Sequence, residues 1–356
     1  MNKLKKIIVT SISGILILST LTGCNNSTSA NLKVGQITDL SGVDDKSFNQ
    51  GAWEGIGLTS VDKKYLIPYS LEPKDTVREI SNLYDLGYRV LVAPGFNFET
   101  AIFEAQALYP DLKIILIDGT PHNGDYNYEI GENTLCIYFT EHESGFLSGV
   151  ATALHIQSGD VGFIGGMEIP AVQKFNWGFQ QGILYANSQL GTSVALKPEN
   201  FIYANSFYDA DLGTKLATEM YDRGVKVIFS AAGGVGVGVI GEAKKRAIQG
   251  EDVWVLGVDV DQYGDGLYAH NQSVILTSAM KYIEQATASA IESIQDGTFE
   301  GQQVITLSAA ENMVGIPQEN PNLSESIQSQ VAQVQEDIKS GKIVVDATND
   351  SGKYIP

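Results

Sequence analysis

Short apolar runs alternate along the chain with longer segments in which apolar residues recur at three- and four-residue spacing. The runs are typical of parallel strands buried on both faces, and the spaced pattern is typical of helices with one apolar face. The runs predict strands over 32–38, 64–68, 89–93, 113–118, 160–164, 226–230 and 252–258. The spaced segments predict helices over 47–60, 76–86, 98–108, 142–155, 175–190, 211–223, 237–249, 281–294 and 323–340.

This alternation predicts βαβ units with right-handed crossovers, and therefore an α/β fold with mostly parallel sheets. The glycine-rich run 159–166 looks like the start of a second unit, so we place a boundary near residue 157. Segments 274–278 and 304–307 are expected to be extended crossings between two lobes. The expected lobes are 32–157 with about 279–303, and 158–273 with about 308–356.

The N-terminus has the features of an export signal. Three lysines precede a short apolar stretch, 7–21, which small polar residues interrupt. An export signal needs about 7–15 apolar residues, whereas a membrane-spanning helix needs about 20. The tetrad 21–24, Leu-Thr-Gly-Cys, resembles the bacterial lipobox, in which the cysteine is lipidated and the signal is removed before it. We expect a signal peptide at 1–23, a lipid anchor at Cys24 and a polar tether at 24–31. An ordinary signal peptide with an incidental cysteine is the alternative.

Cysteine usage and charge narrow the possible partners. The second cysteine, Cys136, lies in an apolar run, which predicts a small buried side chain rather than a nucleophile. With Cys24 lipidated, no disulfide can form within the chain. The formal net charge is −19, and removal of 1–23, with three lysines and no acids, takes it to −22. Such a body repels nucleic acid and anionic lipid surfaces, so no nucleic-acid partner is expected.

Acids and glycines follow several of the predicted strands. Asp39, Asp118 and Asp259 each stand at a strand end, and glycine pairs stand at 165–166 and 233–234. Ligands of open parallel sheets bind beyond the carboxyl ends of the strands. An acid in that position beside glycines has little structural purpose. The sequence therefore predicts two polar rims that face each other across a cleft.

Other acids near these strand ends have a structural explanation. Either Asp44 or Asp45 is expected to cap the helix that begins near residue 47. Either Asp209 or Asp211 is expected to cap the helix predicted at 211–223 in the same way.

One stretch matches the dinucleotide fingerprint G-x-G-x-x-G. Gly236, Gly238 and Gly241 follow a predicted strand, with Asp259 about 20 residues further on. The stretch lies deep in the second half, its first glycine falls several residues beyond the strand end, and an exported protein has little access to NAD. The four histidines lack metal-ligand spacing, and nucleophile-elbow and P-loop motifs are absent from the sequence. We expect no enzyme, no metal and no cofactor.

A family resemblance unites these observations. The segment 38–55, which contains Asp39, Asp45, Phe48 and Asn49, resembles the opening motif of the basic membrane protein family. That family includes the purine nucleoside receptor lipoproteins of bacterial ABC transporters. The resemblance covers nearly the whole chain, with further similar stretches at 143–149, 165–170, 175–179, 231–236 and 257–259.

The resemblance implies a type I periplasmic-binding-protein fold, with two doubly wound parallel-sheet lobes joined by a hinge and a nucleoside held between them. It implies that Phe48 and Phe207 sandwich the base and that Asp39 binds the base edge. Taken alone, each phenylalanine would be assigned to the core. The implied ligand-binding set is Asp39, Phe48, Asn49, Asp118, Phe207, Gly233, Gly234, Asp259 and Lys281.

The expected function is that of a lipid-anchored substrate-binding protein on the extracytoplasmic face of the cell membrane, which passes a nucleoside, purine preferred, to an ABC permease. A riboflavin-type ligand is an alternative, and so is a surface adhesion or signalling role on the same fold. The presence of Asp39, Phe48, Asp259 and Lys281 favours ligand capture. A dinucleotide-dependent enzyme ranks last.

Overall fold

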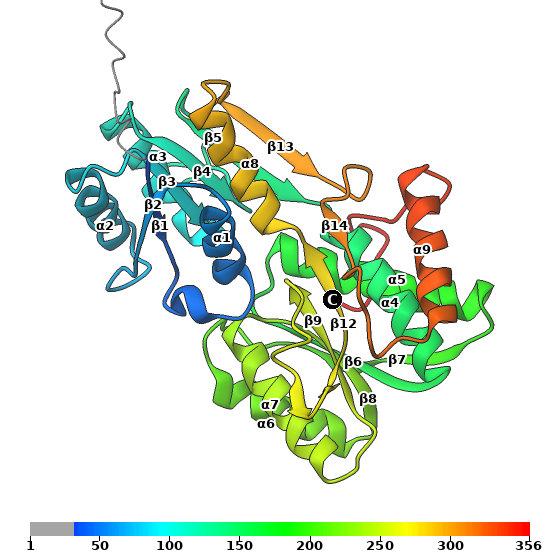
Figure 1. The fold of residues 1–356 in the computed structure, drawn as a ribbon. Helices are drawn as coiled ribbons and strands as arrows, with labels where there is room; N and C mark the ends of the chain where they lie inside the picture. The colour runs from blue at the N-terminus through cyan, green and yellow to red at the C-terminus, as the bar shows by residue number, and fades with distance from the viewer. Residues whose placement is uncertain (1–31) are drawn as a thin grey trace, which may run out of the picture. The chain divides into compact units, whose positions relative to one another are not determined.

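Two six-stranded sheets carry the fold of residues 32–356, the part of the chain that the computed structural model describes (Figure 1). The first sheet has the order β13 (Gln303–Leu307), β5 (Thr134–Phe139), β4 (Lys113–Ile117), β3 (Val90–Pro94), β1 (Lys33–Ile37) and β2 (Asp62–Leu66). The second has the order β14 (Val314–Gly315), β12 (Ile275–Lys281), β9 (Trp254–Asp259), β8 (Val225–Ala231), β6 (Ser158–Gly165) and β7 (Ser193–Tyr203). Neighbouring strands are parallel except β12 and β14. A short hairpin, β10 (Leu267–Ala269) with β11 (Gln272–Ser273), stands apart.

Helices cover both faces of the first sheet. Val90 and Val92 of β3 pack in one apolar cluster with α1 (Phe48–Gly57) and α8 (Ile283–Gln295). The alternate residues Leu91 and Ala93 pack in another with α2 (Pro73–Asp85) and α3 (Glu99–Leu108). Because successive side chains of a strand point to opposite faces, the two helix pairs lie on opposite sides of the sheet.

The second sheet is covered in the same way. Val227 and Phe229 of β8 pack with α4 (Glu141–Ile156) and α5 (Pro170–Gln189), and α9 (Glu325–Lys339) packs on α4. Ile228 packs on the other face with α6 (Ala210–Asp222) and α7 (Gly234–Ile248). Below, the first lobe means the first sheet with α1, α2, α3 and α8, and the second lobe means the second sheet with α4–α7 and α9.

The predicted strands and helices are all present with ends shifted by a few residues, so the predicted α/β fold with two parallel-sheet lobes is confirmed. Besides the two- and three-residue strands β10, β11 and β14, two strands were not predicted. β5 is a short buried run that we assigned only as an apolar segment. β7 contains Pro198 and several exposed polar residues, which is a pattern that an edge strand tolerates.

The passages of the chain between the lobes differ from expectation. Helix α4 packs on α5, β12 and α9, so the chain enters the second lobe near residue 140 rather than near 157. Segment 274–278 is not a crossing, because β12 stays paired with β9 through Met280 and the chain leaves the second sheet after Lys281. Segment 304–307 lies within β13, which pairs with β5 at the edge of the first sheet. The last passage follows Leu307.

Glycines explain why α4 belongs to the second lobe. The two helices α4 and α5 approach so closely that a Cβ on Gly178 would lie 2.1 Å from the carbonyl oxygen of His142. Gly182 has the same relation to the carbonyl oxygen of Phe146, also at 2.1 Å. A side chain at either position would force the helices apart.

Candidate ligand-binding site

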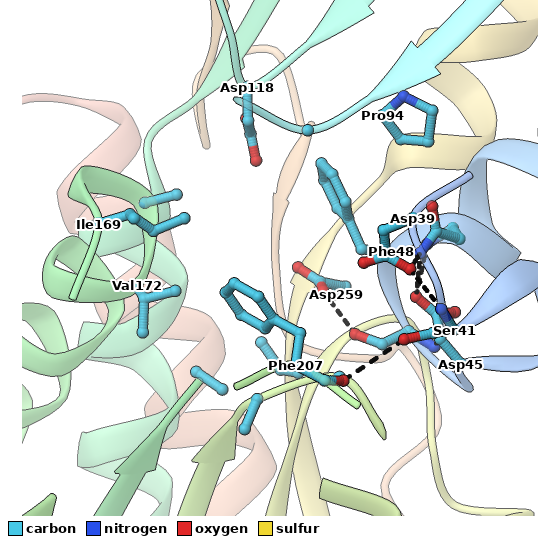
Figure 2. Close-up of a pocket in the computed structure, with 18 of the residues that line it drawn as sticks. Asp39, Ser41, Asp45, Phe48, Pro94, Asp118, Ile169, Val172, Phe207 and Asp259 are labelled. Atoms are coloured by element: carbon cyan, nitrogen blue, oxygen red, sulfur yellow. Dashed lines mark hydrogen bonds between the residues drawn. The ribbon is translucent and has the colours of Figure 1, made fainter. Parts of the chain in front are cut away.

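A cavity lies where strand ends of the two sheets face each other, with about 660 Å³ of empty space if the solvent at its open mouth is included. First-lobe residues that follow β1, β3 and β4 line one side, and second-lobe residues that follow β6, β7, β8 and β9 line the other (Figure 2). In the first sheet the strand order reverses between β1 and β3, and in the second between β6 and β8. Both lobes therefore present their topological switch points to one space, where open α/β sheets bind ligands.

Most of the predicted ligand residues meet in this cavity. Its lining includes Asp39, Phe48, Asn49, Asp118, Phe207, Gly233, Asp259 and Lys281. The exception is Gly234, whose backbone N–H donates to the carbonyl oxygen of Phe207 at 2.7 Å. Gly234 therefore holds the segment that carries Phe207 and does not itself face the cavity.

Two aromatic rings enter the cavity from different lobes. Phe48 is the first residue of α1, and Phe207 follows β7; Figure 2 shows both reaching into the same space. Gly166 makes room for the second ring, because a Cβ there would lie 2.2 Å from a carbon of Phe207. Ile169 and Val172 add an apolar wall on the second-lobe side. The rings and this wall suit a flat apolar moiety.

The first-lobe acids form a hydrogen-bonded cluster. Asp45 accepts from the backbone N–H groups of Ser47, Asn49 and Gln50 at 3.1, 2.8 and 3.0 Å, which confirms its predicted capping role. The Asn49 side chain donates to both Asp39 and Asp45, each at 3.0 Å. Burial raises the pKa of Asp39 and raises that of Asp45 to about 6. The cluster offers a ligand edge a carboxylate whose orientation Asn49 sets.

A second group of charged side chains surrounds Lys281 in the cavity. Nζ of Lys281 lies 2.5 Å from Oδ2 of Asp118, 3.5 Å from Oδ1 of Asp259 and 4.5 Å from the centre of the Phe48 ring. Burial alone would lower the pKa of Lys281, but Asp118, Asp259 and Glu141 outweigh it and raise the pKa, so the ammonium stays charged.

Asp118 and Asp259 occupy equivalent places, directly after β4 and at the end of β9. Both adopt left-handed backbone conformations, with φ of 54° and 64°, which aspartate tolerates better than most residues. Oδ1 of Asp118 is buried and has no hydrogen-bond donor among residues 32–356, and Oδ1 of Asp259 has only the distant ammonium. These oxygens are free to accept from ligand hydroxyl groups.

Hydrogen bonds join the lobes around the cavity. Oγ of Ser47 donates to Oδ2 of Asp259 at 2.5 Å, and the side-chain amide of Gln262 donates to the carbonyl oxygen of Lys46 at 2.6 Å. Together with the bond from Lys281 to Asp118, they connect residues that follow strands of both sheets. The two lobes, as the structure places them, are therefore joined by polar contacts of their own, besides those that a ligand would add.

Sequence reasoning missed several contributors. Ser47 stands in the opening motif that we recognised, but its bond to Asp259 depends on how the lobes meet. Neither Glu141 nor Lys174 was among the predicted site residues. Glu141 lies behind the cavity beside Lys281, and Lys174 lies beside Glu141. The wall at 169–175 follows the predicted strand at 160–164, so strand-end reasoning extended by a few residues would have found it.

The remaining predictions concern side chains outside the cavity. Cys136 is fully buried, and burial raises the pKa of its thiol to about 12, which confirms an unreactive packing role. Asp209 caps α6 by accepting from the N–H of Leu212, as expected for one of the two candidate acids. Within residues 32–356 no helix is long and apolar enough to span a membrane, and no cluster of acids, histidines or cysteines has metal-ligand geometry.

The dinucleotide fingerprint has a different role from the one its pattern indicates. Gly236, Gly238 and Gly241 all lie inside α7 rather than in a strand-to-helix turn. A Cβ on Gly238 would overlap the carbonyl oxygen of Ala210, so this glycine allows α7 to pack on α6.

Comparison with known proteins agrees with this geometry. Residues 32–349 match the family model Bmp, described as "ABC transporter substrate-binding protein PnrA-like". The chain is 29% identical over 362 residues to an "ABC transporter nucleoside-binding protein BmpA" of Lactococcus lactis, covering 96% of this chain and 99% of that protein. It is 31% identical over 330 residues to a "CD4+ T-cell-stimulating antigen" of Listeria monocytogenes, covering 89% and 88%. A solved solute-binding protein of an Aeropyrum pernix ABC transporter superposes with a TM-score of 0.72 at 23% identity, over 90% of this chain and 95% of that one.

The family match, together with the fold and the cleft, thus defines a substrate-binding protein of an ABC transporter, of the periplasmic-binding-protein type and not an enzyme. Within that class, the chain belongs to the Bmp family of PnrA-like substrate-binding proteins.

Proposed function

We propose that this protein binds a nucleoside, with a purine base preferred, between its lobes and delivers it to an ABC permease. The observation that carries the proposal is the convergence of two aromatic rings and two strand-end carboxylates, from different lobes, on one cavity. A relative that covers nearly the whole chain bears the name nucleoside-binding protein, which supports the same ligand class.

The base would lie between Phe48 and Phe207. Stacking of a base on an aromatic ring contributes about 1–3 kcal/mol and tolerates different bases. Asp39, oriented by Asn49, would accept hydrogen bonds from N–H groups on the base edge. The preference for a purine rests on the resemblance of the segment around Asp39 and Phe48 to purine nucleoside receptors.

The sugar would lie against Asp118, Asp259 and Lys281. The available oxygens of the two aspartates accept from sugar hydroxyls, and the ammonium donates to a sugar oxygen. Acids outnumber lysines at this end of the cavity, so a phosphate placed there would be repelled. We therefore propose a nucleoside rather than a nucleotide.

Ligand binding would favour the closed protein because each lobe supplies one ring. A ligand that contacts both Phe48 and Phe207 has a higher affinity for the closed arrangement than for an open one. The bonds from Ser47 to Asp259 and from Gln262 to Lys46 support the same arrangement. The closed form is then what the permease would recognise.

A thermal-shift panel tests the ligand class. It compares nucleosides, free bases, nucleotides, riboflavin and NAD, and we expect the largest stabilisation from a purine nucleoside. If riboflavin gave the strongest response, the proposed ligand class would be a flavin instead of a nucleoside. If NAD gave the strongest response, a dinucleotide ligand would be favoured. No response to any compound would favour the adhesion or signalling role.

Two substitutions test the site. Phe48→Ala should weaken nucleoside binding by about 5- to 150-fold through the lost stacking, measured by calorimetry. Asp259→Ala should weaken binding of a ribonucleoside more than that of its deoxy analogue, because the lost acceptor serves a sugar hydroxyl. Unchanged affinity in both variants would contradict the proposed site even if binding itself persisted.

Membrane attachment is a separate part of the proposal. We propose that Cys24 carries the lipid anchor and that the body lies on the extracytoplasmic face; residues 1–31 are outside the described part of the structure. Labelling of cells with radioactive palmitate should depend on Cys24. Incorporation that persists in Cys24→Ala would place the anchor elsewhere.

A further inference from the structure

Glu141 is a buried carboxylate that stands behind the ligand cavity and does not line it. It is the first residue of α4, and its side chain is 1% exposed. Neither of its oxygens has a hydrogen-bond partner in the described part of the chain. Two lysines flank it instead: Oε1 lies 3.7 Å from Nζ of Lys281, and Oε2 lies 3.4 Å from Nζ of Lys174.

The helix start alone does not explain this side chain. An acid in the first turn interacts favourably with the helix dipole, but an exposed acid has the same interaction without the cost of burial. Glu141 also makes no capping hydrogen bond. Burial, and then the neighbouring Asp118, raise its pKa to about 7, although Lys281 and Lys174 oppose the rise. The carboxylate is thus less favourable in the folded protein than in water, and a neutral side chain of the same shape would serve the fold better.

The surrounding charges show what the carboxylate does. Lys174 on α5 is 25% exposed, so an alternating series leads inward from it through Glu141 to Lys281, and from there to Asp118 and Asp259. The ammonium of Lys281 has ionic partners on two sides. Asp118 and Asp259 attract it from the cavity side, and Glu141 attracts it from behind.

Without Glu141, the ammonium would have ionic partners only among cavity-lining residues. It would then move towards Oδ1 of Asp259, from which it is now 3.5 Å away, and occupy an oxygen that a ligand needs. It would also lose its fixed place over the Phe48 ring, 4.5 Å from the ring centre. A charge held behind the site keeps both the lysine and the acceptors in position.

We infer that Glu141 is a positioning residue for Lys281 and that Lys174 supports it from outside, so that the series Lys174–Glu141–Lys281 sets the ligand affinity of the cleft. The inference rests on the proposed function for the identity of the ligand, and on the contacts above for its geometry.

Calorimetric titration with adenosine tests the inference in Glu141→Gln, Lys174→Gln and the double variant. At about pH 8, we expect Glu141→Gln to weaken binding by about tenfold, the lower end of the loss seen when the partner that orients a metal-ligating side chain is removed. Lys174→Gln should weaken binding less, and it should add nothing in the Glu141→Gln background because it acts through Glu141. Glu168→Gln, an equal loss of charge at an exposed position outside the cavity lining, is the matched control and should bind as the wild type does.

A pH profile separates positioning from general structural damage. The charged groups that face Glu141 are Lys281, Lys174 and Asp118. At about pH 5.5, Glu141 of the wild type is protonated, so wild type and Glu141→Gln should bind adenosine with similar affinity. Equal affinity at pH 8 as well, or additive effects of the two single substitutions, would overturn the inference.

A measurement on the protein alone keeps this inference distinct from the proposed function. If the wild type bound neither adenosine nor any other nucleoside, the proposed function would be refuted. The series of charges would still be tested by the ¹³C carboxyl resonance of Glu141, identified by its loss in Glu141→Gln. We expect a titration midpoint near 7 in the wild type and a higher one in Lys174→Gln. A midpoint near 4.5 in both proteins would overturn the inference.

Discussion

Replacing Glu141 by glutamine should make the ligand-free protein more stable at alkaline pH. The folded protein raises the pKa of this group from 4.5 to about 7, because burial and Asp118 disfavour its charge. Between these two values, the folded state binds a proton that the unfolded state has released, so stability falls as pH rises. Glutamine imitates the protonated form at every pH and does not incur this loss.

The expected magnitude follows from the two pKa values. A shift of about 2.5 units at about 1.4 kcal/mol per unit gives about 3 kcal/mol above pH 7, and almost nothing below pH 4.5. For a body of this size, that corresponds to about 4 °C in the unfolding temperature. The gain in stability would accompany a loss of affinity, as expected where a functional charge is costly to the fold.

Differential scanning calorimetry at about pH 5 and pH 8 measures the effect, with Glu168→Gln as the control that removes an exposed charge. The wild type and Glu141→Gln should unfold at similar temperatures at the lower pH and separate at the higher. A variant that is less stable than the wild type at pH 8 would show that the carboxylate stabilises the fold. An equal difference in unfolding temperature between the two proteins at pH 5 and pH 8 would show that protonation of Glu141 is not the cause.

Other parts of the structure lead to further predictions. Gln262→Ala removes the bond to the carbonyl oxygen of Lys46, so a larger fraction of molecules should have separated lobes. We expect to see this fraction by small-angle scattering, together with faster release of a nucleoside. Gln303→Ala, at an exposed edge-strand position, should change neither result. Gly178→Ala brings a methyl group against the carbonyl oxygen of His142; we expect destabilisation by about 1–3 kcal/mol in urea unfolding, and a variant as stable as the wild type would show that α4 and α5 can separate freely. Ser47→Ala leaves Oδ2 of Asp259 without its donor and should raise the pKa of that carboxyl further, which would be seen as weaker binding at mildly acidic pH than the wild type shows; an unchanged pH profile would contradict it.

Much of the fold and the acids of the proposed site could be predicted because they depend on local rules, whereas Phe48, Phe207 and Lys281 were predicted only through the family resemblance. Buried parallel strands produce continuous apolar runs. Ligands of such sheets bind beyond the carboxyl ends of the strands, which is the edge where Asp39, Asp118 and Asp259 lie. The capping role of Asp45 follows from its place before a helix. These properties need no knowledge of how the lobes meet.

The rest depends on contacts between distant segments. The lobe to which α4 belongs is decided by glycines whose partners are carbonyl groups of another helix, and periodicity does not show that match. Glu141 has the sequence pattern of an ordinary helix start, and its environment arises from Lys174 and Lys281 on two other elements. The glycine fingerprint in α7 is the reverse case: the local pattern indicates a dinucleotide site, but the glycines lie inside a helix and serve its packing.

The position of Lys281 limits how this protein can change its ligand. The residue ends β12, and the chain passes directly from it towards the other lobe, so a replacement there alters movement and recognition together. Residues 94–97 run from the last residue of β3 into the loop after it and line the cavity from one lobe only, so they do not combine these two roles. Divergence towards new cargo should therefore accumulate in that loop, and descendants with altered preference should keep the lysine.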